Sequence, residues 1–339
     1  MLPWDKEMAG RLDRLTITSD ALAANPLGDP VERPLWVYVP PGYEAGERRY
    51  PTVYVLQGYT GFVTRWANRS AYLPTYPEAA DDLFASGKAP PCIVVFVDAW
   101  TAYGGSQFVD SPGTGAYHTY LCDEVVPFVD ARYRTLAAAG HRALQGHSSG
   151  GFGAMVTPML RPDLFGALAS HAGDALYEVL YLPEFAKSVR ALRRYEGSIF
   201  SWWDDFRSRV PFTRPEDHTL LMVLGVAACF SADGDGTPLL PFDPTNGRLV
   251  DDVWERWLAW DPVRMAASRA PELGGLRAVW LDGGTSDEWY LDVGAAAVRD
   301  AFQAAGVTEL RFELFDGRHG GVEWRYPLAL AYLAERLSP

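Results

Sequence analysis

The stretch from Arg142 to Val156 limits the fold of this chain more than any other feature. Its first four residues, Arg142-Ala143-Leu144-Gln145, have the apolar-edged pattern of a strand, and its last six, Gly151-Phe152-Gly153-Ala154-Met155-Val156, favour a helix. The turn between them, Gly146-His147-Ser148-Ser149-Gly150, has the G-x-S-x-G spacing that is typical of a nucleophile elbow in a strand–turn–helix setting. Glycine at both ends leaves room for a strained central serine. The amides that begin the helix favour negative charge beside Ser148.

The rest of the chain alternates between strand and helix patterns. Residues 52–56 and 92–97 are short, continuous apolar runs, as expected of strands buried on both faces. The expected strands are 12–22, 34–40, 52–56, 92–97, 142–145, 168–171, 276–281 and 310–315, and the expected helices beyond the turn are 120–133, 293–305 and 327–337. This alternation predicts an α/β fold with a mainly parallel sheet and helices on both faces, in which the first strands could pair antiparallel.

Residues 176–265 interrupt this alternation and are rich in aromatic side chains and prolines. We expect a core formed by residues 1–175 and 266–339, with 176–265 as a partly helical, cap-like insertion. Trp202, Trp203 and Phe206 are candidates for substrate binding by ring stacking, or they pack the cap on the sheet. A second group with helical spacing, Trp254, Trp257 and Trp260, is predicted to lie in the core. The loop with Asp233 and Asp235 lacks the rest of a calcium-binding pattern, so a plain turn is expected.

Composition narrows the classes of function. The chain has 339 residues, 48% of them apolar, and a net charge of −13 without any basic block, which argues against nucleic-acid binding. Three widely spaced cysteines, Cys92, Cys122 and Cys229, indicate neither a disulfide framework nor a zinc site, and no metal or cofactor is implied. The charged start has no signal-peptide pattern and no run is long enough to span a membrane, so we expect a cytoplasmic protein without membrane contact. The oligomeric state stays open, with a homodimer as one option.

A serine hydroxyl is nearly inert at neutral pH and needs a base, which in turn needs an acid. In a parallel sheet such groups gather at the carboxyl ends of strands. His319 follows the 310–315 strand and Asp287 follows the 276–281 strand, which gives the chain order Ser, Asp, His that a nucleophile elbow requires. His171 is the rival base; the remaining histidines are expected elsewhere, with His147 leaning away from the site and His218 in solvent. The rival acids are Glu288, Asp174 and Asp282.

Acyl transfer also needs hydrogen-bond donors for a developing oxyanion. The amide of Ser149, next to the predicted nucleophile, is one candidate. The second donor is expected from the loop after the 52–56 strand, as the amide of Gly58 or Tyr59.

Four motifs in this order resemble the putative-esterase family of the α/β-hydrolases, which includes S-formylglutathione hydrolase, feruloyl and acetyl-xylan esterases, enterochelin esterases and antigen 85 mycolyltransferases. The motifs are Val53-Tyr54-Val55-Leu56-Gln57-Gly58, Gly146-His147-Ser148-Ser149-Gly150-Gly151, Gly284-Thr285-Ser286-Asp287-Glu288 and Phe315-Asp316-Gly317-Arg318-His319. The resemblance implies an α/β-hydrolase fold, with Ser148 as nucleophile, Asp287 as acid and His319 as base. Gln57 departs from the family, which often has histidine before the oxyanion glycine.

Three functions follow as hypotheses. The first is hydrolysis of a small-molecule carboxylic ester through an acyl-enzyme on Ser148. The second is transfer of the acyl group to a sugar or another alcohol by the same residues. The third is a binding module that has kept the fold without the chemistry.

Overall fold

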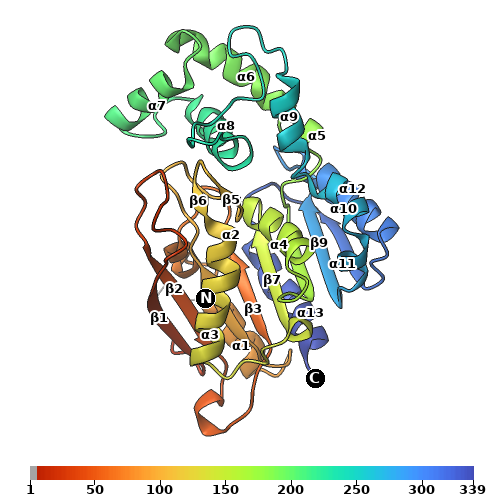
Figure 1. Ribbon diagram of the computed structural model, residues 1–339. Coiled ribbons are helices and arrows are strands. Elements are labelled where there is room, and N and C mark those ends of the chain that lie inside the picture. The colour runs from red at the N-terminus through yellow and green to blue at the C-terminus, as the bar shows by residue number, and fades with distance from the viewer. Residues whose placement is uncertain (1–5) are drawn as a thin grey trace.

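A computed structural model describes residues 6–339, and its centre is one eight-stranded sheet (Figure 1). The strand order is β1-β2-β4-β3-β7-β8-β9-β10. These strands are β1 (Arg11–Thr18), β2 (Glu32–Val39), β3 (Thr52–Leu56), β4 (Ile93–Val97), β7 (Arg142–His147), β8 (Ala167–His171), β9 (Ala278–Gly284) and β10 (Leu310–Phe315). β2 pairs antiparallel with β1 and β4, and the other neighbours are parallel. The predicted α/β architecture, including its antiparallel first strands, is confirmed.

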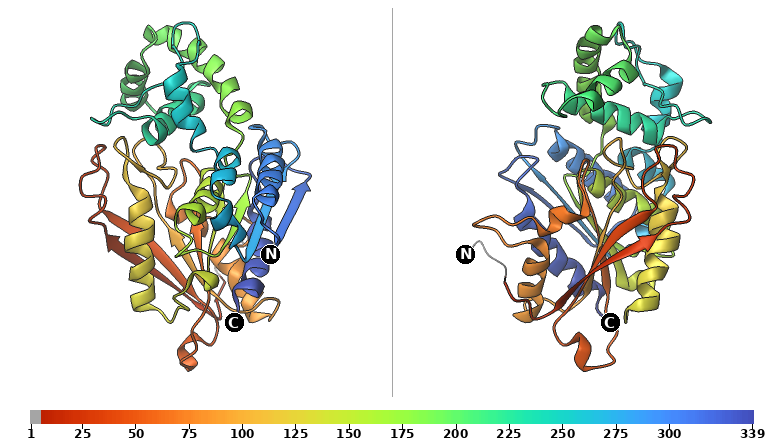
Figure 2. Two further views of the ribbon diagram at one scale, coloured as in Figure 1. Left: turned by 45° about the vertical axis from the view of Figure 1, so that its right-hand side comes forward. Right: turned by 90° about the vertical axis from the view of Figure 1, so that its left-hand side faces the viewer.

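Helices cover both faces of this sheet because successive side chains of β3 and β4 point to opposite faces and are apolar on both. Val53 and Val55 of β3 pack with α1 (Tyr76–Ala85) and α13 (Tyr326–Leu337), whereas Tyr54 and Leu56 face the opposite side. The opposite face is covered by α3 (Val126–Arg132), α4 (Ser149–Leu160), α10 (Pro262–Ser268), α11 (Ala270–Gly274) and α12 (Leu291–Ala304) (Figures 1 and 2). Every residue of β3, β4, β7 and β8 is buried. The continuous apolar runs predicted this for β3 and β4.

Two expected elements differ in detail. The helix predicted over 120–133 consists of a short α2 (Tyr117–Thr119), a π-type turn over 120–125 and then α3. Pro127 has no N–H to donate to the preceding turn, so the regular α-helical ladder is interrupted there. The first strand ends at Thr18, and Leu22 is instead buried in the turn that follows. A small hairpin of β5 (Asp110–Ser111) and β6 (Gly115–Ala116) was not predicted.

Helices of the 176–265 segment lie over one end of the sheet (Figures 1 and 2). They are α5 (Tyr177–Leu180), α6 (Leu182–Leu192), α7 (Ile199–Ser208), α8 (Asp217–Phe230) and α9 (Asp251–Leu258), and we refer to this segment as the cap. Trp254 and Trp257 are buried and Trp260 packs against the same cluster, so the prediction that these three belong to the core is confirmed. α8 is apolar around most of its circumference because it lies between the other cap helices and the core.

The loop with Asp233 and Asp235 forms a turn closed on itself, because Oδ1 of Asp233 accepts hydrogen bonds from the amides of Asp235 and Thr237 at 3.2 and 3.1 Å. Within residues 6–339, none of the helices combines the length and the apolar character needed to cross a membrane.

Candidate active site

Ser148 sits at the predicted turn between β7 and α4 in a strained backbone conformation. Its φ of 57° and ψ of −125° lie in a region that residues other than glycine seldom adopt. This conformation costs about 1–3 kcal/mol. The surrounding backbone holds it there: the amide of Ser148 donates to the carbonyl of His171 at 3.0 Å, and its carbonyl accepts from Phe152 at 2.9 Å. The turn therefore presents the Ser148 hydroxyl at the carboxyl end of the sheet.

The two glycines of the motif are required by close backbone contact. A Cβ on Gly146 would overlap the backbone of Gly150, and a Cβ on Gly150 would overlap the carbonyl oxygens of Leu56 and Gln57, the latter at 2.6 Å. Neither obstacle is a flexible side chain that could move aside. The turn can therefore approach β3 only with glycine at these two positions.

We expect Gly150→Ala to lower the free energy of unfolding by more than about 3 kcal/mol, because the new methyl group overlaps fixed backbone. Gly46→Ala is the matched control, since a Cβ there has open space and Gly46 has extended backbone. Its effect should stay within about 0.5 kcal/mol. Denaturant unfolding followed by circular dichroism measures both. Equal stabilities of the two variants would contradict the close-approach argument.

Backbone hydrogen bonds join the loops that follow β9 and β10. The amide of Thr285 donates to the carbonyl of Phe315 at 2.9 Å, and the amide of Ser286 donates to the carbonyl of Gly317 at 2.8 Å. These contacts bring Asp287 of one loop next to His319 of the other.

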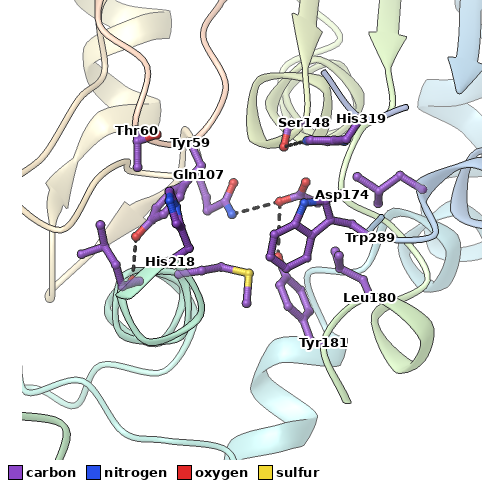
Figure 3. Close-up of a pocket in the computed structure, with 13 residues that line it drawn as sticks. Tyr59, Thr60, Gln107, Ser148, Asp174, Leu180, Tyr181, His218, Trp289 and His319 are labelled. Atoms are coloured by element: carbon purple, nitrogen blue, oxygen red, sulfur yellow. Dashed lines mark hydrogen bonds between the residues drawn. The ribbon is translucent and has the colours of Figure 1, made fainter. Parts of the chain in front are cut away.

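Ser148, His319 and Asp287 form a continuous hydrogen-bonded chain. Nε2 of His319 lies 3.1 Å from Oγ of Ser148 (Figure 3). Nδ1 of His319 lies 2.8 Å from Oδ2 of Asp287. The other carboxylate oxygen of Asp287 accepts the amide of Trp289 at 2.8 Å, and the side chain of Asp287 is buried. A carboxylate held in this way fixes the Nδ1–H tautomer of His319 and leaves Nε2 free to take a proton from Ser148.

The rival acids and base have other partners. Oε2 of Glu288 accepts the backbone amide of His319 at 3.1 Å rather than its ring, and Glu288 pairs with Arg318 at the surface. His171 is fully buried, with Nδ1 2.9 Å from Oδ1 of Asp282 and Nε2 3.0 Å from Nε2 of Gln145. Both ring nitrogens of His171 therefore have partners other than Ser148, namely Asp282 and Gln145.

Asp282 belongs to the same buried network as His171. Its Oδ2 accepts from Nε1 of Trp280 at 2.7 Å and from Nε of Arg325 at 2.9 Å. Burial acts to raise the pKa of this carboxyl, but the contacts with His171, Trp280 and Arg325 outweigh burial and lower it. Asp282 thus links β9 to the segment before α13 and does not contact His319.

His147 differs from the expectation that it leans away from the site. Its ring packs against the ring of His319, with centroids 4.6 Å apart, and its Nε2 lies 2.9 Å from the carbonyl oxygen of His319. Burial lowers the pKa of His147 well below its usual value, so the ring is neutral and Nε2–H donates to that carbonyl. The expectation was wrong because the turn directs the side chain before the serine toward the loop after β10.

Two of the predicted oxyanion donors, Ser149 and Gly58, belong to residues beside Ser148. Ser149 begins α4, so its amide is one of the helix N–H groups without an intrahelical acceptor. Gly58 lies directly beside the turn, since a Cβ on it would be 3.5 Å from Cβ of Ser148. Tyr59 follows, and its hydroxyl lies between the carbonyl oxygens of Tyr103 and Leu221, which ties this loop to α8 of the cap. The amide side chain of Gln57 closes the loop by donating to Gly61 at 2.6 Å.

A cavity of about 230 Å³ opens at Ser148 between the sheet and the cap (Figure 3). Its walls come from the loops after β3, β4, β8, β9 and β10 together with the cap helices. They are Tyr59, Thr60, Gln107, Ser148, Asp174, Leu180, Tyr181, His218, Leu221, Met222, Trp289, Leu291 and His319. His218 is exposed, as expected, but it also lines this cavity. Its ring stacks on Phe212 with centroids 4.5 Å apart.

Trp202, Trp203 and Phe206 do not line this cavity. Trp202 is fully buried inside the cap, where Nε1 donates to Asp217 at 3.3 Å, and Phe206 is buried beside it. Trp203 stacks on Phe206 and meets Tyr103 edge-on. The expectation that these rings bind substrate at Ser148 was wrong for Trp202 and Phe206, which α7 turns toward the interior of the cap. Trp203 is half-buried and contacts Phe206 and Tyr103 instead of lining the cavity.

Gln107 and Trp289 are cavity residues that the sequence reading missed. Gln107 lies in the loop that follows β4, and Trp289 lies two residues beyond Asp287. Both come after strand ends, which is the signal that could have found them. Asp174 was considered only as an acid for the histidine, yet it lines the cavity without contacting His319 by a hydrogen bond.

Burial raises the pKa of Asp174, so this carboxyl reduces stability at neutral pH. The contribution of Asp174 to the free energy of unfolding is most favourable at pH values below the pKa that this carboxyl has in the unfolded chain. It is lost as the pH rises through the higher pKa that the carboxyl has in the folded protein. We therefore expect Asp174→Asn to raise Tm by about 2 °C at pH 7.5, and by less at pH 4.5. Calorimetry at both pH values measures this. An equal or larger gain at pH 4.5 would contradict the argument.

The chain is similar in sequence to known proteins. Residues 30–332 match the model of the family described as "Putative esterase". The chain is 30% identical over 169 residues to an endo-1,4-beta-xylanase/feruloyl esterase of Xylanibacter ruminicola, a match that covers 46% of this chain and 21% of that protein. It is 28% identical over 143 residues to an esterase of Mycobacterium tuberculosis, covering 41% of this chain and 28% of the relative. The chain thus spans less than a third of either relative.

Solved structures resemble the whole chain. A ferulic acid esterase superposes with a TM-score of 0.62 at 20% identity, covering 97% of this chain and all of that one. An S-formylglutathione hydrolase from Agrobacterium tumefaciens superposes with a TM-score of 0.59 at 16% identity, covering 98% of each chain. At these identities the likeness establishes the α/β-hydrolase fold. Because the family model spans nearly the full length, the chain belongs to the "Putative esterase" family.

Proposed function

We propose that this protein is a serine hydrolase that cleaves a carboxylic ester. The observation that supports it most is the hydrogen-bonded chain from Ser148 through His319 to Asp287, at 3.1 and 2.8 Å, which opens into a cavity. Membership of an esterase family, and similarity to proteins named feruloyl esterase and S-formylglutathione hydrolase, support the same reaction class.

In the first half of the reaction, Oγ of Ser148 attacks the ester carbonyl while Nε2 of His319 takes its proton. The tetrahedral intermediate collapses when protonated His319 gives that proton to the leaving alkoxide, which departs as an alcohol. The acyl group is then bound to Ser148. In the second half, His319 takes a proton from water, the hydroxide attacks the acyl-enzyme, and the acid leaves as the proton returns to Ser148.

The amides of Ser149 and of Gly58 or Tyr59 are proposed to stabilise the negative oxygen of both tetrahedral intermediates. The position of Ser149 at the first turn of α4 and the close approach of Gly58 to Ser148 support this role. Donors of this kind typically contribute about 3 kcal/mol each to the transition state. Asp287 stabilises the positive charge that develops on His319.

The test is stopped-flow hydrolysis of 4-nitrophenyl acetate. An acyl-enzyme mechanism predicts a burst of about one equivalent of nitrophenol per active site, followed by slower turnover, wherever deacylation limits the rate. Analysis of products in the presence of an added alcohol distinguishes hydrolysis from acyl transfer. Absence of any turnover of activated esters by folded protein would contradict the proposed function.

A further inference from the structure

Asp174 places a nearly buried carboxyl in the wall of the cavity at Ser148 (Figure 3). It follows β8 and is 8% exposed, and its amide lies 3.4 Å from the carbonyl oxygen of Ser148. Oδ2 accepts from Nε2 of Gln107 at 3.2 Å and from the hydroxyl of Tyr181 at 3.3 Å. The second oxygen, Oδ1, accepts no hydrogen bond from residues 6–339. The reaction described above does not use this group.

The loop that holds Gln107 against Asp174 is strained. Gln107 and Phe108 have φ values of 51° and 54°, and two successive left-handed residues other than glycine cost about 1–3 kcal/mol each. Gln107 is buried, and its Oε1 has no hydrogen-bond partner within the described part of the chain. Strained residues and buried polar atoms without a partner are enriched at functional sites, so the pair of Gln107 and Asp174 points to a built site.

Charge and polarity define what this site can bind. The residues that line the cavity, all within 6–339, include no lysine or arginine. Its aliphatic part is formed by Leu180, Leu221, Met222 and Leu291. A desolvated carboxylate without a cationic partner is unfavourable, which is consistent with the effect of burial on the pKa of Asp174. A ligand that donates a hydrogen bond to the carboxylate would offset this cost. The rings of Tyr181 and Trp289 in the same wall would also tolerate a positive charge.

We propose that Asp174 selects the substrate. The cavity takes an ester that carries an ammonium or a hydroxyl group, and this group donates a hydrogen bond to Oδ1 of Asp174. The inference rests on the proposed ester hydrolysis, because Ser148 and Asp174 share one cavity. The apolar wall holds the hydrocarbon part of the substrate, and Asp174 holds its polar end. Asp174 is thus a specificity residue rather than a member of the hydrogen-bonded chain at Ser148.

The test uses esters that differ in one group of matched size. One series is methyl 3-phenylpropanoate with an ethyl, hydroxymethyl or aminomethyl group at the 4-position of the ring. The second series is 2-phenylethyl acetate with the same three groups. The rigid ring keeps the donor from attacking its own ester, and the two series show whether the donor belongs to the acyl or the alcohol part. The ratio of kcat/KM for donor and ethyl esters is compared within each protein, so differences in active concentration cancel.

The wild-type protein is expected to prefer a donor ester to its ethyl analogue by about tenfold or more in one series, and Asp174→Asn is expected to remove most of that preference. Asp300→Asn, which removes a negative charge at the surface of α12, should keep it. If the aminomethyl ester has the higher kcat/KM, Asp174 recognises an ammonium group; if the hydroxymethyl ester has the higher value, it recognises a hydroxyl group. Equal turnover of donor and ethyl esters by the wild type, or an unchanged preference in Asp174→Asn, would overturn the inference.

Failure of the proposed function gives a different result, namely no turnover of any ester. Calorimetric titration with the esters of both series, which stay intact in that case, then decides the inference. Binding of a donor compound that is about tenfold tighter than that of the ethyl compound, and that is lost in Asp174→Asn, supports it. Equal binding of the three esters within each of the two series overturns it.

Discussion

Replacing Ser148 with alanine is expected to lower kcat for ester hydrolysis by at least about 10⁴-fold. The substitution removes the only oxygen that lies within hydrogen-bond distance of Nε2 of His319 among residues 6–339. The remaining donors and the cavity could still bind an ester, but no covalent intermediate could form. Steady-state kinetics with 4-nitrophenyl acetate measures the loss. Retention of more than a tenth of wild-type turnover by purified Ser148→Ala would contradict the assignment of the nucleophile.

Ser148→Gly separates lost chemistry from lost folding. Because Ser148 has a φ of 57°, glycine relieves backbone strain, and the free energy of unfolding is expected to rise by about 1 kcal/mol. The variant should nevertheless be as inactive as Ser148→Ala. A protein that is more stable and yet inactive cannot owe its inactivity to misfolding.

Replacing Asp287 with asparagine is expected to lower kcat by about 10³–10⁴-fold. Asparagine keeps the size of the side chain but removes the charge that stabilises protonated His319, and its amide nitrogen can turn the ring to the wrong tautomer. Oδ2 of Asp287 lies 2.8 Å from Nδ1 of His319, so the change acts directly on the ring. Kinetics at saturating ester measure the effect.

Glu288→Gln is the matched control for Asp287→Asn. The neighbouring carboxylate of Glu288 accepts the backbone amide of His319 rather than its ring and pairs with Arg318, and its side chain is 42% exposed. A glutamine oxygen can accept the same amide, so kcat should stay within about tenfold of wild type. A larger loss in Glu288→Gln than in Asp287→Asn would exchange the roles of the two carboxylates.

The sequence was most informative where local pattern and topology agree. The continuous apolar runs of β3 and β4 required burial on both faces, and parallel pairing then placed the segments after Leu56, His147, Gly284 and Phe315 at one edge of the sheet. For this reason Ser148, Asp287 and His319 could be named together although up to 171 residues separate them along the chain.

Side-chain direction inside the cap could not be predicted in the same way. Helical spacing identifies which side chains share a face of α7, but it does not say whether that face meets the substrate cavity or the other cap helices. Trp202 faces the latter, where it contacts Asp217. The direction of His147 and the partners of Asp174 depend on loops that are distant in sequence, namely those after β10 and β4. Only the folded arrangement of those loops determines these contacts.

Reaction with a fluorophosphonate ester, followed by mass spectrometry, shows whether Ser148 is an activated nucleophile. The reagent requires an activated serine, so the account predicts one adduct per chain, located by peptide mapping at Ser148, with complete loss of ester hydrolysis. Labelling should fall strongly in Asp287→Asn and should persist in Glu288→Gln. A folded protein that hydrolyses esters while Ser148 stays unmodified, or while the adduct lies on another residue, would contradict the account.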